Sequence, residues 1–404
     1  MIVNGRLTTV VVPRAALDAA TEPNKARELT QAVVDYVNNM QRVGVYPRHE
    51  MPAEAMQAYH ANYYVDQVSN GGHSQFIRNT GVAMLPAASA DALGGLEAMG
   101  ARAQRQILAE MIAWLTANPE QARAQNGSSR VPALDQLDKR FLDAERETPM
   151  TPLAARWIAR WPDLRPVAGV QYRAELDRLA QLNPQLGPRR VWQGVQQLRF
   201  QMKDGLQVRV GVACGAITPE PELKLAIFAG ADLEIEGKTC KVFGLRTDKG
   251  TRLCTIEDTR ARLFELVRPD PPPKTATPEE TRKHKPVEAG ARLSEVSMDT
   301  IRQFAAVAEQ TMAAEAIDLL LRKSGIDAGA MITAWKLKDR AAIWIAVSGQ
   351  KRAAMWTSPD QAAVVGPGGA PTVTVTRAEI ERHAAVAADG GASMRPPARA
   401  AAKA

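Results

Sequence analysis

Apolar residues recur at helical spacing through the first 165 residues of the chain. One such stripe consists of Leu29, Val33, Tyr36, Val37 and Met40. Similar stripes follow over residues 93–115, 134–141 and 153–161. This period is typical of helices that bury one face against a shared core. We therefore predict an all-helical domain over residues 1–165, preceded by a short β-hairpin about the Asn4-Gly5 turn signal.

The period of the apolar pattern changes from helical to alternating after Pro166. Alternation predicts strands over residues 207–213, 223–228, 232–236, 241–245 and 251–256. Turn signals at Glu236-Gly237-Lys238 and Asp248-Lys249-Gly250 join neighbouring strands by short connections. Because parallel strands need long crossovers, we expect an antiparallel sheet in an α+β domain over residues 166–267.

A proline-rich and charged stretch, residues 268–293, lacks an apolar period and predicts an extended linker. A second small α+β domain follows over residues 294–389, with a helix near Asp299 and a hairpin about Ser348-Gly349-Gln350. Residues 390–404 hold little to bury, so we expect a disordered tail. The predicted fold class is multi-domain α and α+β: one helical domain, then two small modules with antiparallel sheets.

The stretch from Tyr59 to Gly81 predicts a helix, a tight corner and a second short helix. Its corner is Asn70-Gly71-Gly72, whose residues tolerate positive φ. We interpret the side-chain amides of Asn70, Gln75 and Asn79 as partners for backbone groups that the corner exposes. These residues are therefore predicted to be structural.

An ordered set of residues in this stretch resembles the DNA mimic protein family of bacteria. The set consists of Asn70, Gly71, Gly72, Gln75, Phe76, Asn79 and Gly81. Residues 92–101 and 134–141 look like later parts of the same family, so the resemblance extends over about residues 20 to 165. It implies an all-helical domain that, in the best-known case, imitates the charge pattern of DNA and captures a DNA-binding repressor.

The charge of the N-terminal domain departs from that of a DNA mimic. Before Pro166 we count about 17 basic and about 17 acidic residues, whereas duplex DNA carries about one charge per 1.7 Å of axis. An acidic cluster offers a docking handle for a protein partner, although Lys139, Arg140 and Arg146 interrupt it. The cluster consists of Asp135, Asp138, Asp143, Glu145 and Glu147.

The whole chain is basic, with a formal net charge of +7, and this supports an alternative function in nucleic-acid binding. Two basic pairs have an aromatic neighbour suitable for stacking on bases. They are Arg189 and Arg190 beside Trp192, and Lys351 and Arg352 near Trp356. Solvated strand edges are the simpler interpretation of the same residues, since charges there block aggregation.

We find no catalytic or cofactor motif in the sequence. Gly237-Lys238-Thr239 resembles the end of a phosphate-binding loop, but Asp232 stands where that loop needs glycine. The three cysteines lack metal-site spacing, and we interpret Cys214 as a buried thiol.

The five histidines were the remaining candidates for metal binding. His49, His60 and His73 cluster near Glu50 and Asp66, and we interpret them as surface or corner residues rather than metal ligands. We expect no cofactor and no bound metal.

These patterns favour a non-catalytic bacterial interaction protein that binds a macromolecular partner, with a DNA-binding regulator as one such partner. The alternative is a nucleic-acid-associated regulator that uses the basic later domains. A third reading is an enzyme with a site between the first two domains. The chain opens without a charged and apolar leader and has no apolar run of membrane-spanning length, so we expect a cytoplasmic protein.

Overall fold

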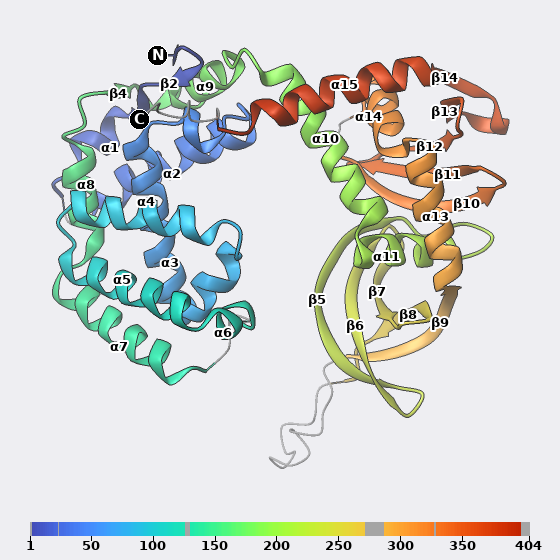
Figure 1. Ribbon diagram of the computed structural model, residues 1–404, viewed down its shortest axis with the longest axis horizontal. Helices are drawn as coiled ribbons and strands as arrows, with labels where there is room; N and C mark the ends of the chain where they lie inside the picture. The colour runs from blue at the N-terminus through green and yellow to red at the C-terminus, as the bar shows by residue number, and fades with distance from the viewer. Residues whose placement is uncertain (1, 23, 126–129, 271–286, 327–328, 397–404) are drawn as a thin grey trace, which may run out of the picture. The chain divides into compact units, whose positions relative to one another are not determined.

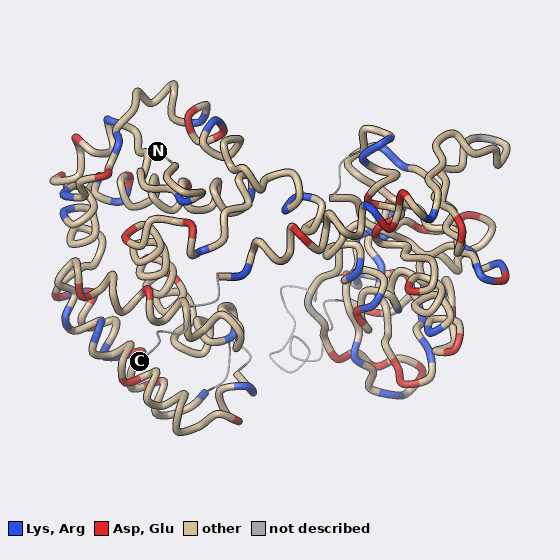
Figure 2. The backbone as a smooth tube through the Cα atoms, turned by 45° about the horizontal axis from the view of Figure 1, so that its top comes forward, with Lys and Arg blue, Asp and Glu red and all other residues tan. Residues whose placement is uncertain are grey.

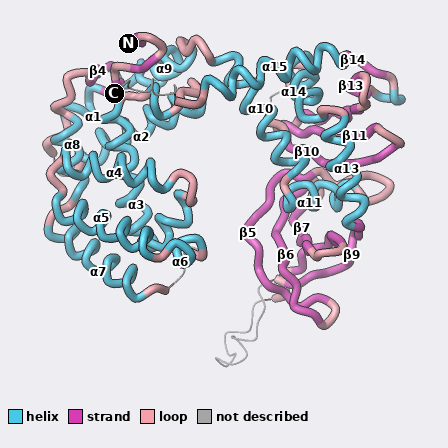
Figure 3. The backbone as a smooth tube through the Cα atoms, in the orientation of Figure 1, coloured by secondary structure: helices cyan, strands magenta, loops and turns pink. Residues whose placement is uncertain are grey.

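The computed structural model describes residues 2–22, 24–125, 130–270, 287–326 and 329–396 (Figure 1). Two compact units divide the chain: Met1–Leu186 with Ser393–Ala404, and Gly187–Ala392. Figure 3 shows that helices dominate the first unit, whereas the second combines strands with helices. The predicted fold class is confirmed: a helical N-terminal region is followed by antiparallel sheets with helices.

Unit 1 contains nine described helices and two pairs of short strands. The helices are α1 (Arg14–Asp18), α2 (Ala26–Arg42), α3 (Ala53–Thr80), α4 (Leu85–Ala98), α5 (Arg102–Ala117), α6 (Pro119–Arg123), α7 (Pro132–Glu147), α8 (Met150–Ile158) and α9 (Gly169–Gln181), with a single 3-10 turn, η1 (Arg48–Glu50). The predicted hairpin is confirmed, because β1 (Ile2–Val3) pairs with β2 (Arg6–Leu7) about Asn4 and Gly5, both at positive φ.

The first unit extends beyond the predicted boundary at residue 165. Strand β3 (Val10–Pro13) pairs in parallel with β4 (Leu164–Val167), and α9 packs Leu176 and Leu179 into the same core as α2. The prolines near residue 165 suggested a break in the chain. Pro166 instead lies in β4, in a two-stranded pair where proline is tolerated, and Pro162 lies in the turn before it.

Unit 2 contains two five-stranded antiparallel sheets. The first follows α10 (Leu186–Lys203) and α11 (Gly205–Gly215), and its strands are β5 (Lys224–Ile235), β6 (Lys238–Thr247), β7 (Gly250–Ile256), β8 (Arg260–Val267) and β9 (Glu288–Ser297). The second follows α13 (Met298–Gln310) and α14 (Ala313–Lys323), and its strands are β10 (Met331–Lys338), β11 (Ala341–Ser348), β12 (Lys351–Thr357), β13 (Gln361–Val365) and β14 (Pro371–Thr376). A 3-10 turn, η2 (Pro367–Gly369), precedes β14, and α15 (Arg377–Ser393) closes the unit.

The order of elements in unit 2 repeats. Among the described residues, each half has a helix, an 11-residue helix and five strands in sequential order. The tight turns before the fourth strands match, with Glu257 N donating to Arg260 O and Ser358 N to Gln361 O. The hydrogen bonds at the start of the helix after each sheet also match. Met298 N donates to Thr259 O, and Arg377 N donates to Asp360 O, both at 2.8 Å. Unit 2 is therefore a tandem structural repeat, and one buried cluster spans both halves.

Several predicted elements of the later chain were wrong. Residues 207–213 form helix α11 rather than a strand, because this helix is buried on nearly all sides and shows no polar face. Strands β8, β9, β10 and β13 were not predicted. The two strands predicted over 223–236 are one bulged strand, β5.

Parts of the predicted linker and of the predicted tail belong to a strand and a helix. Strand β9 occupies the end of the predicted linker 268–293, and α15 continues to Ser393 inside the predicted tail 390–404. Residues 271–286 and 397–404 lie outside the described residues. One shared core joins the predicted domains 166–267 and 294–389, because Leu263 of β8 and Trp344 of β11 belong to the same cluster.

Lys224, at the start of β5, is fully buried, and its Nζ lies 3.1 Å from Gln207 Oε1. Burial lowers the pKa of Lys224 from 10.5 to about 8. Both folded and unfolded chains are protonated below pH 8, so the buried ammonium is destabilising there. Between about pH 8 and 10.5 the unfolded chain binds more protons, and stability therefore rises with pH.

We predict that Lys224→Met stabilises the protein at pH 7 by roughly 1 to 2 kcal/mol. The full penalty of the pKa shift is about 3 kcal/mol, and the loss of a partner for Gln207 offsets part of the gain. Urea unfolding of both proteins at pH 7.0 and 9.5 measures this difference. A gain of the same size at both pH values would contradict the assignment, because it would not come from the charge.

Candidate functional site

The predicted corner interrupts α3 inside unit 1. Gly71 and Gly72 depart from helical geometry, with φ of −159° and +76°, and the helix ends before Gly81, at φ +73°. The predicted helix, corner and second helix are thus confirmed. Positive φ at Gly72 favours glycine.

Asp138 of α7 accepts hydrogen bonds from the corner of α3. Its Oδ1 accepts the backbone N–H of His73 at 2.7 Å and lies 2.5 Å from His73 Nδ1. Because a carboxylate only accepts, the ring proton is on Nδ1, and Nε2 accepts from the Tyr64 hydroxyl at 2.9 Å. A Cβ on Gly72 would lie 2.2 Å from Asp138 Oδ2. The corner therefore packs directly against the carboxylate.

Tyr64, His73 and Asp138 form a chain of hydrogen bonds, and a substrate cannot reach Tyr64 or His73. Neither the His73 ring nor Tyr64 exposes any surface, and the rings of Phe76 and Phe141 pack edge-on against Tyr64. Burial raises the pKa of Tyr64 well above its ordinary value. The arrangement stabilises the packing of α3 on α7, and it does not expose a nucleophile or base.

The polar residues predicted to satisfy the corner have other partners. Gln75 Nε2 and Asn79 Nδ2 both donate to Gln67 Oε1, at 3.1 and 2.6 Å. Gln67 lies 8 and 12 residues earlier in the chain, too far for contact along a straight helix with a rise of about 1.5 Å per residue. The non-helical corner at Gly71 and Gly72 therefore brings the second helical segment back to Gln67. Asn70 is exposed, whereas Phe76 is fully buried in the core. The backbone partner at the corner is Asp138, which sequence reasoning placed in a different set.

A hollow of about 340 Å³ lies beside the corner and brings together two sets of predicted residues. Asn70, Gly71 and Gly72 line it from α3, and Asp135 and Asp138 line it from α7. Arg130 lies 3.7 Å from Asp135 across an exposed surface. Residues that carry the family resemblance and residues of the acidic cluster therefore lie in one region of unit 1.

The five predicted docking carboxylates divide into two groups. Asp138 and Glu145 have internal partners, since Glu145 accepts from Gln104 Nε2 at 2.7 Å and from the Met150 N–H, and burial raises its pKa. Asp135, Asp143 and Glu147 are on the outer side of α7, and Asp143 pairs with Arg146 at 2.9 Å. Figure 2 shows that both signs of charge are spread over each unit. This surface is not a dense acidic face.

The basic pairs proposed for nucleic acid are only partly accessible. Arg189 is 1% exposed and so does not present its charge to a phosphate, and Trp192 is half-buried. Arg190 is half-buried and its carbonyl accepts from Arg322. Lys351 and Arg352 are exposed at the start of β12, which is a central strand rather than an edge. The alternative function, nucleic-acid binding, therefore depends on Lys351 and Arg352.

The remaining candidate chemistry has structural explanations. His60 lies 2.9 Å from Asp91, which also accepts from Arg48, and these bonds outweigh burial and lower the pKa of Asp91. Across the described residues, no group of three or more His, Cys, Asp or Glu could hold a metal ion. Gly237 lies in the turn between β5 and β6, where no helix begins. Burial raises the pKa of Cys214 to about 12, which leaves it a poor nucleophile.

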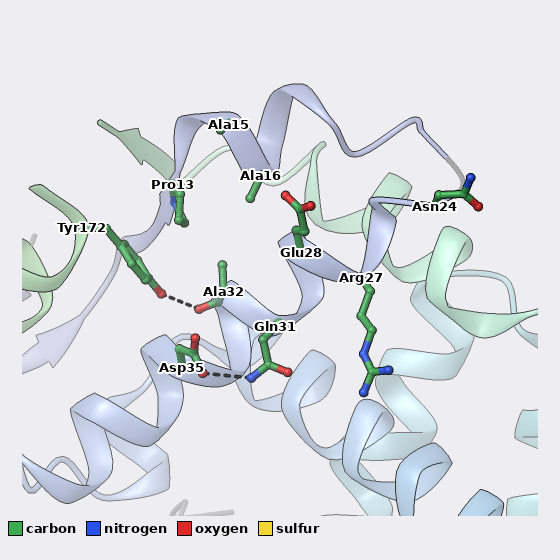
Figure 4. Close-up of a pocket in the computed structure, with 10 residues that line it drawn as sticks. All are labelled: Pro13, Ala15, Ala16, Asn24, Arg27, Glu28, Gln31, Ala32, Asp35 and Tyr172. Carbon is green, nitrogen blue, oxygen red and sulfur yellow. Dashed lines mark hydrogen bonds between the residues drawn. The ribbon is translucent and has the colours of Figure 1, made fainter. Parts of the chain in front are cut away.

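A second hollow of unit 1, about 640 Å³, lies beside α1 and α2 (Figure 4). Its polar groups include Tyr172, whose hydroxyl donates to Ala32 O at 2.7 Å, and Gln31, which donates to Asp35 at 2.9 Å. The side chains of Glu28 and Arg27 do not converge with them (Figure 4). The described residues that line this hollow include no pair of nucleophile and base.

Sequence reasoning missed the pairing of His73 with Asp138. These residues are 65 positions apart, so local patterns could not connect them. One signal was present: Asp138 lies four residues after Leu134 and three before Phe141, which places it on the same side of the helix as these buried residues. An acidic residue there needs a partner inside the protein.

The comparisons with known proteins concern unit 1 alone. No described helix is long and apolar enough to cross a membrane. No curated protein and no solved structure matches the chain. A family model described as DMP19-like protein, where DMP19 denotes DNA mimic protein 19, matches residues 49–161. This match lies within the range of the resemblance seen in the sequence, and it includes Tyr64, His73 and Asp138.

Proposed function

We propose that this chain is a non-catalytic protein that binds a DNA-binding protein through its helical unit. The match of residues 49–161 to the DMP19-like family carries this proposal. The contact residues are the outward carboxylates of α7: Asp135, Asp143 and Glu147. A bacterial cytoplasm is the compartment in which we expect this partner.

Asp138 and Glu145 have a supporting role in this proposal. Their internal bonds fix α7 against the corner and against α5, so the outer side of α7 is presented in one orientation. A rigid element lowers the entropy lost when a partner binds. We therefore leave Asp138 and Glu145 out of the proposed set of docking residues.

The spacing of the outward carboxylates predicts a modest electrostatic contact. With a rise of about 1.5 Å per residue, Asp143 lies about 12 Å along the helix from Asp135 and about 6 Å from Glu147. DNA carries a charge about every 3.4 Å on each strand. The carboxylates are therefore sparser than phosphates, and additional polar or apolar contacts have to contribute to affinity.

We predict that Asp135→Asn, Asp143→Asn and Glu147→Gln together weaken partner binding about tenfold at low salt, because complementary charges steer association. The control has the same charge change on unit 2: Asp299→Asn, Glu309→Gln and Glu381→Gln, all at exposed positions. Tagged full-length proteins are used to capture partners from nuclease-treated lysate. Equal recovery by all three proteins would contradict the assignment of the α7 surface.

The second function, nucleic-acid binding by unit 2, has its own signature in this experiment. Partners that disappear after nuclease treatment would be bridged by nucleic acid. Replacing Lys351 and Arg352 with glutamine would then abolish capture, and the binding would weaken steeply with salt. Persistence of a partner after nuclease treatment favours the helical unit.

A further inference from the structure

An apolar groove lies between the end of α3, α4, α5 and α6. Its volume is about 470 Å³, and its walls include Ile77, Leu85, Leu93, Ile112 and Leu115. Val82, at 60% exposed, borders the same groove. Small-molecule sites have volumes of roughly 300 to 1,000 Å³, mainly apolar walls and a few placed polar groups. The groove has the size of such a site.

Two polar groups distinguish this groove from a plain apolar surface. Ser89 lines it and is 3% exposed, and its Oγ has no hydrogen-bond partner among the described residues. A buried hydroxyl left in this state is unfavourable by roughly 1 to 3 kcal/mol. A ligand oxygen that accepts from Ser89 would remove this cost.

The second polar group of the groove is the positively charged side chain of Arg123, in α6. It is the one charged residue among the described residues that line the groove, and its side chain is 62% exposed. Glu120 pairs with it from one turn earlier. A guanidinium has five N–H donors, so it can also bind a second carboxylate. The groove is thus complementary to an apolar body with an anionic head.

We infer that this groove binds an amphipathic monocarboxylate, such as a medium-chain fatty acid. The hydrocarbon chain lies between α4 and α5, and the carboxylate, which holds the only oxygens of the ligand, accepts from both Arg123 and Ser89. The volume favours this occupant over a partner helix, which needs a longer groove with anchors at several helical turns. This site is independent of the α7 surface and of the proposed function.

Calorimetric titration of the full-length protein with octanoate, decanoate and dodecanoate, below their micellar concentrations, tests the inference. Each added pair of methylenes contributes up to about 1.6 kcal/mol, equivalent to a gain in affinity of up to about 15-fold. Decyltrimethylammonium has the same chain length as decanoate but a positive head. It should bind at least about tenfold more weakly than decanoate.

Two variants at the rim are expected to act in opposite directions. Arg123→Gln should weaken decanoate binding about fivefold to tenfold, because it removes the cation. Glu120→Gln should strengthen binding about twofold to fivefold, because it removes the competing carboxylate. Arg146→Gln is the matched control, since Arg146 is exposed and pairs with Asp143 on α7, and it should not change the affinity.

Ser89→Ala tests the first polar group and should weaken decanoate binding about threefold. Circular dichroism melts of each variant establish that the fold is retained. The inference is overturned if decanoate shows no saturable binding, or if Arg123→Gln and Glu120→Gln both bind as the natural protein does. Equal binding of the cationic and anionic detergents would show adventitious binding only, and would overturn it as well.

Discussion

Replacing Gly215 with alanine is expected to destabilise unit 2 by about 3 kcal/mol or more. Gly215 ends α11, where the helix meets β10. A Cβ at this position would lie 1.6 Å from the carbonyl oxygen of Ala334 and 2.7 Å from its carbon. Both are backbone atoms of β10, so they cannot rotate away as a side chain would. Overpacking of this kind forces α11 away from β10.

Gly211 provides the matched control for this substitution. It lies one turn earlier on α11 and approaches the same strand, but its Cβ would be 3.5 Å from Ile332 O, an ordinary contact. Alanine there gains helix propensity of roughly 0.5 to 1 kcal/mol. Urea unfolding should thus show Gly215→Ala strongly destabilised and Gly211→Ala unchanged or more stable. Equal effects would mean that α11 does not approach β10 as closely as described.

Asp138→Ala is expected to destabilise unit 1 by roughly 2 to 5 kcal/mol. The substitution leaves two donors of His73 without their acceptor, the backbone N–H and Nδ1–H. Each buried donor left unsatisfied costs roughly 1 to 3 kcal/mol. Thermal and urea unfolding measure the loss.

Asp143→Ala is the control, because it removes a carboxylate of the same helix that is 47% exposed and pairs with nearby Arg146. A surface pair of this kind contributes roughly 0 to 1 kcal/mol. If Asp138→Ala is no more destabilising than Asp143→Ala, then Asp138 is a surface carboxylate and belongs with the docking residues. The comparison therefore decides how the acidic cluster is divided.

Features of the fold that depend on neighbouring residues were predictable from the sequence. The Asn4-Gly5 hairpin and the Gly71-Gly72 corner require positive φ locally, and both were found. The stripe from Leu29 to Met40 faces the core, with each of its five apolar residues fully buried. In each case the cause lies within one or two turns of the chain.

Features that depend on distant residues were not predictable in the same way. Val208, Val210 and Val212 alternate like a strand, but surrounding elements bury α11 so completely that its sequence has no polar side. The repeat in unit 2 was missed because its halves share an order of elements and little sequence. Arg189 resembles a surface cation in the sequence, and its burial in the structure is a tertiary effect.

The candidate site shows the same division between local and distant causes. The residues of the resemblance and the acidic cluster were both identified, but as separate features. Asp138 belongs to the acidic cluster but contacts the corner, so we assign it a structural role in place of the predicted docking role. The exposed carboxylates that remain form a sparse set, which is consistent with the near-neutral charge of the N-terminal region.

The measurement that tests the central claim most directly is displacement of DNA from the captured partner. The partner is bound to a fluorescent DNA duplex, full-length protein is added, and anisotropy reports the released duplex. We predict that the natural protein displaces the duplex and that the Asp135→Asn, Asp143→Asn, Glu147→Gln variant needs about tenfold more protein to do so. If the duplex stays bound while the protein also binds, or if both proteins displace it equally, the proposed role of α7 is contradicted.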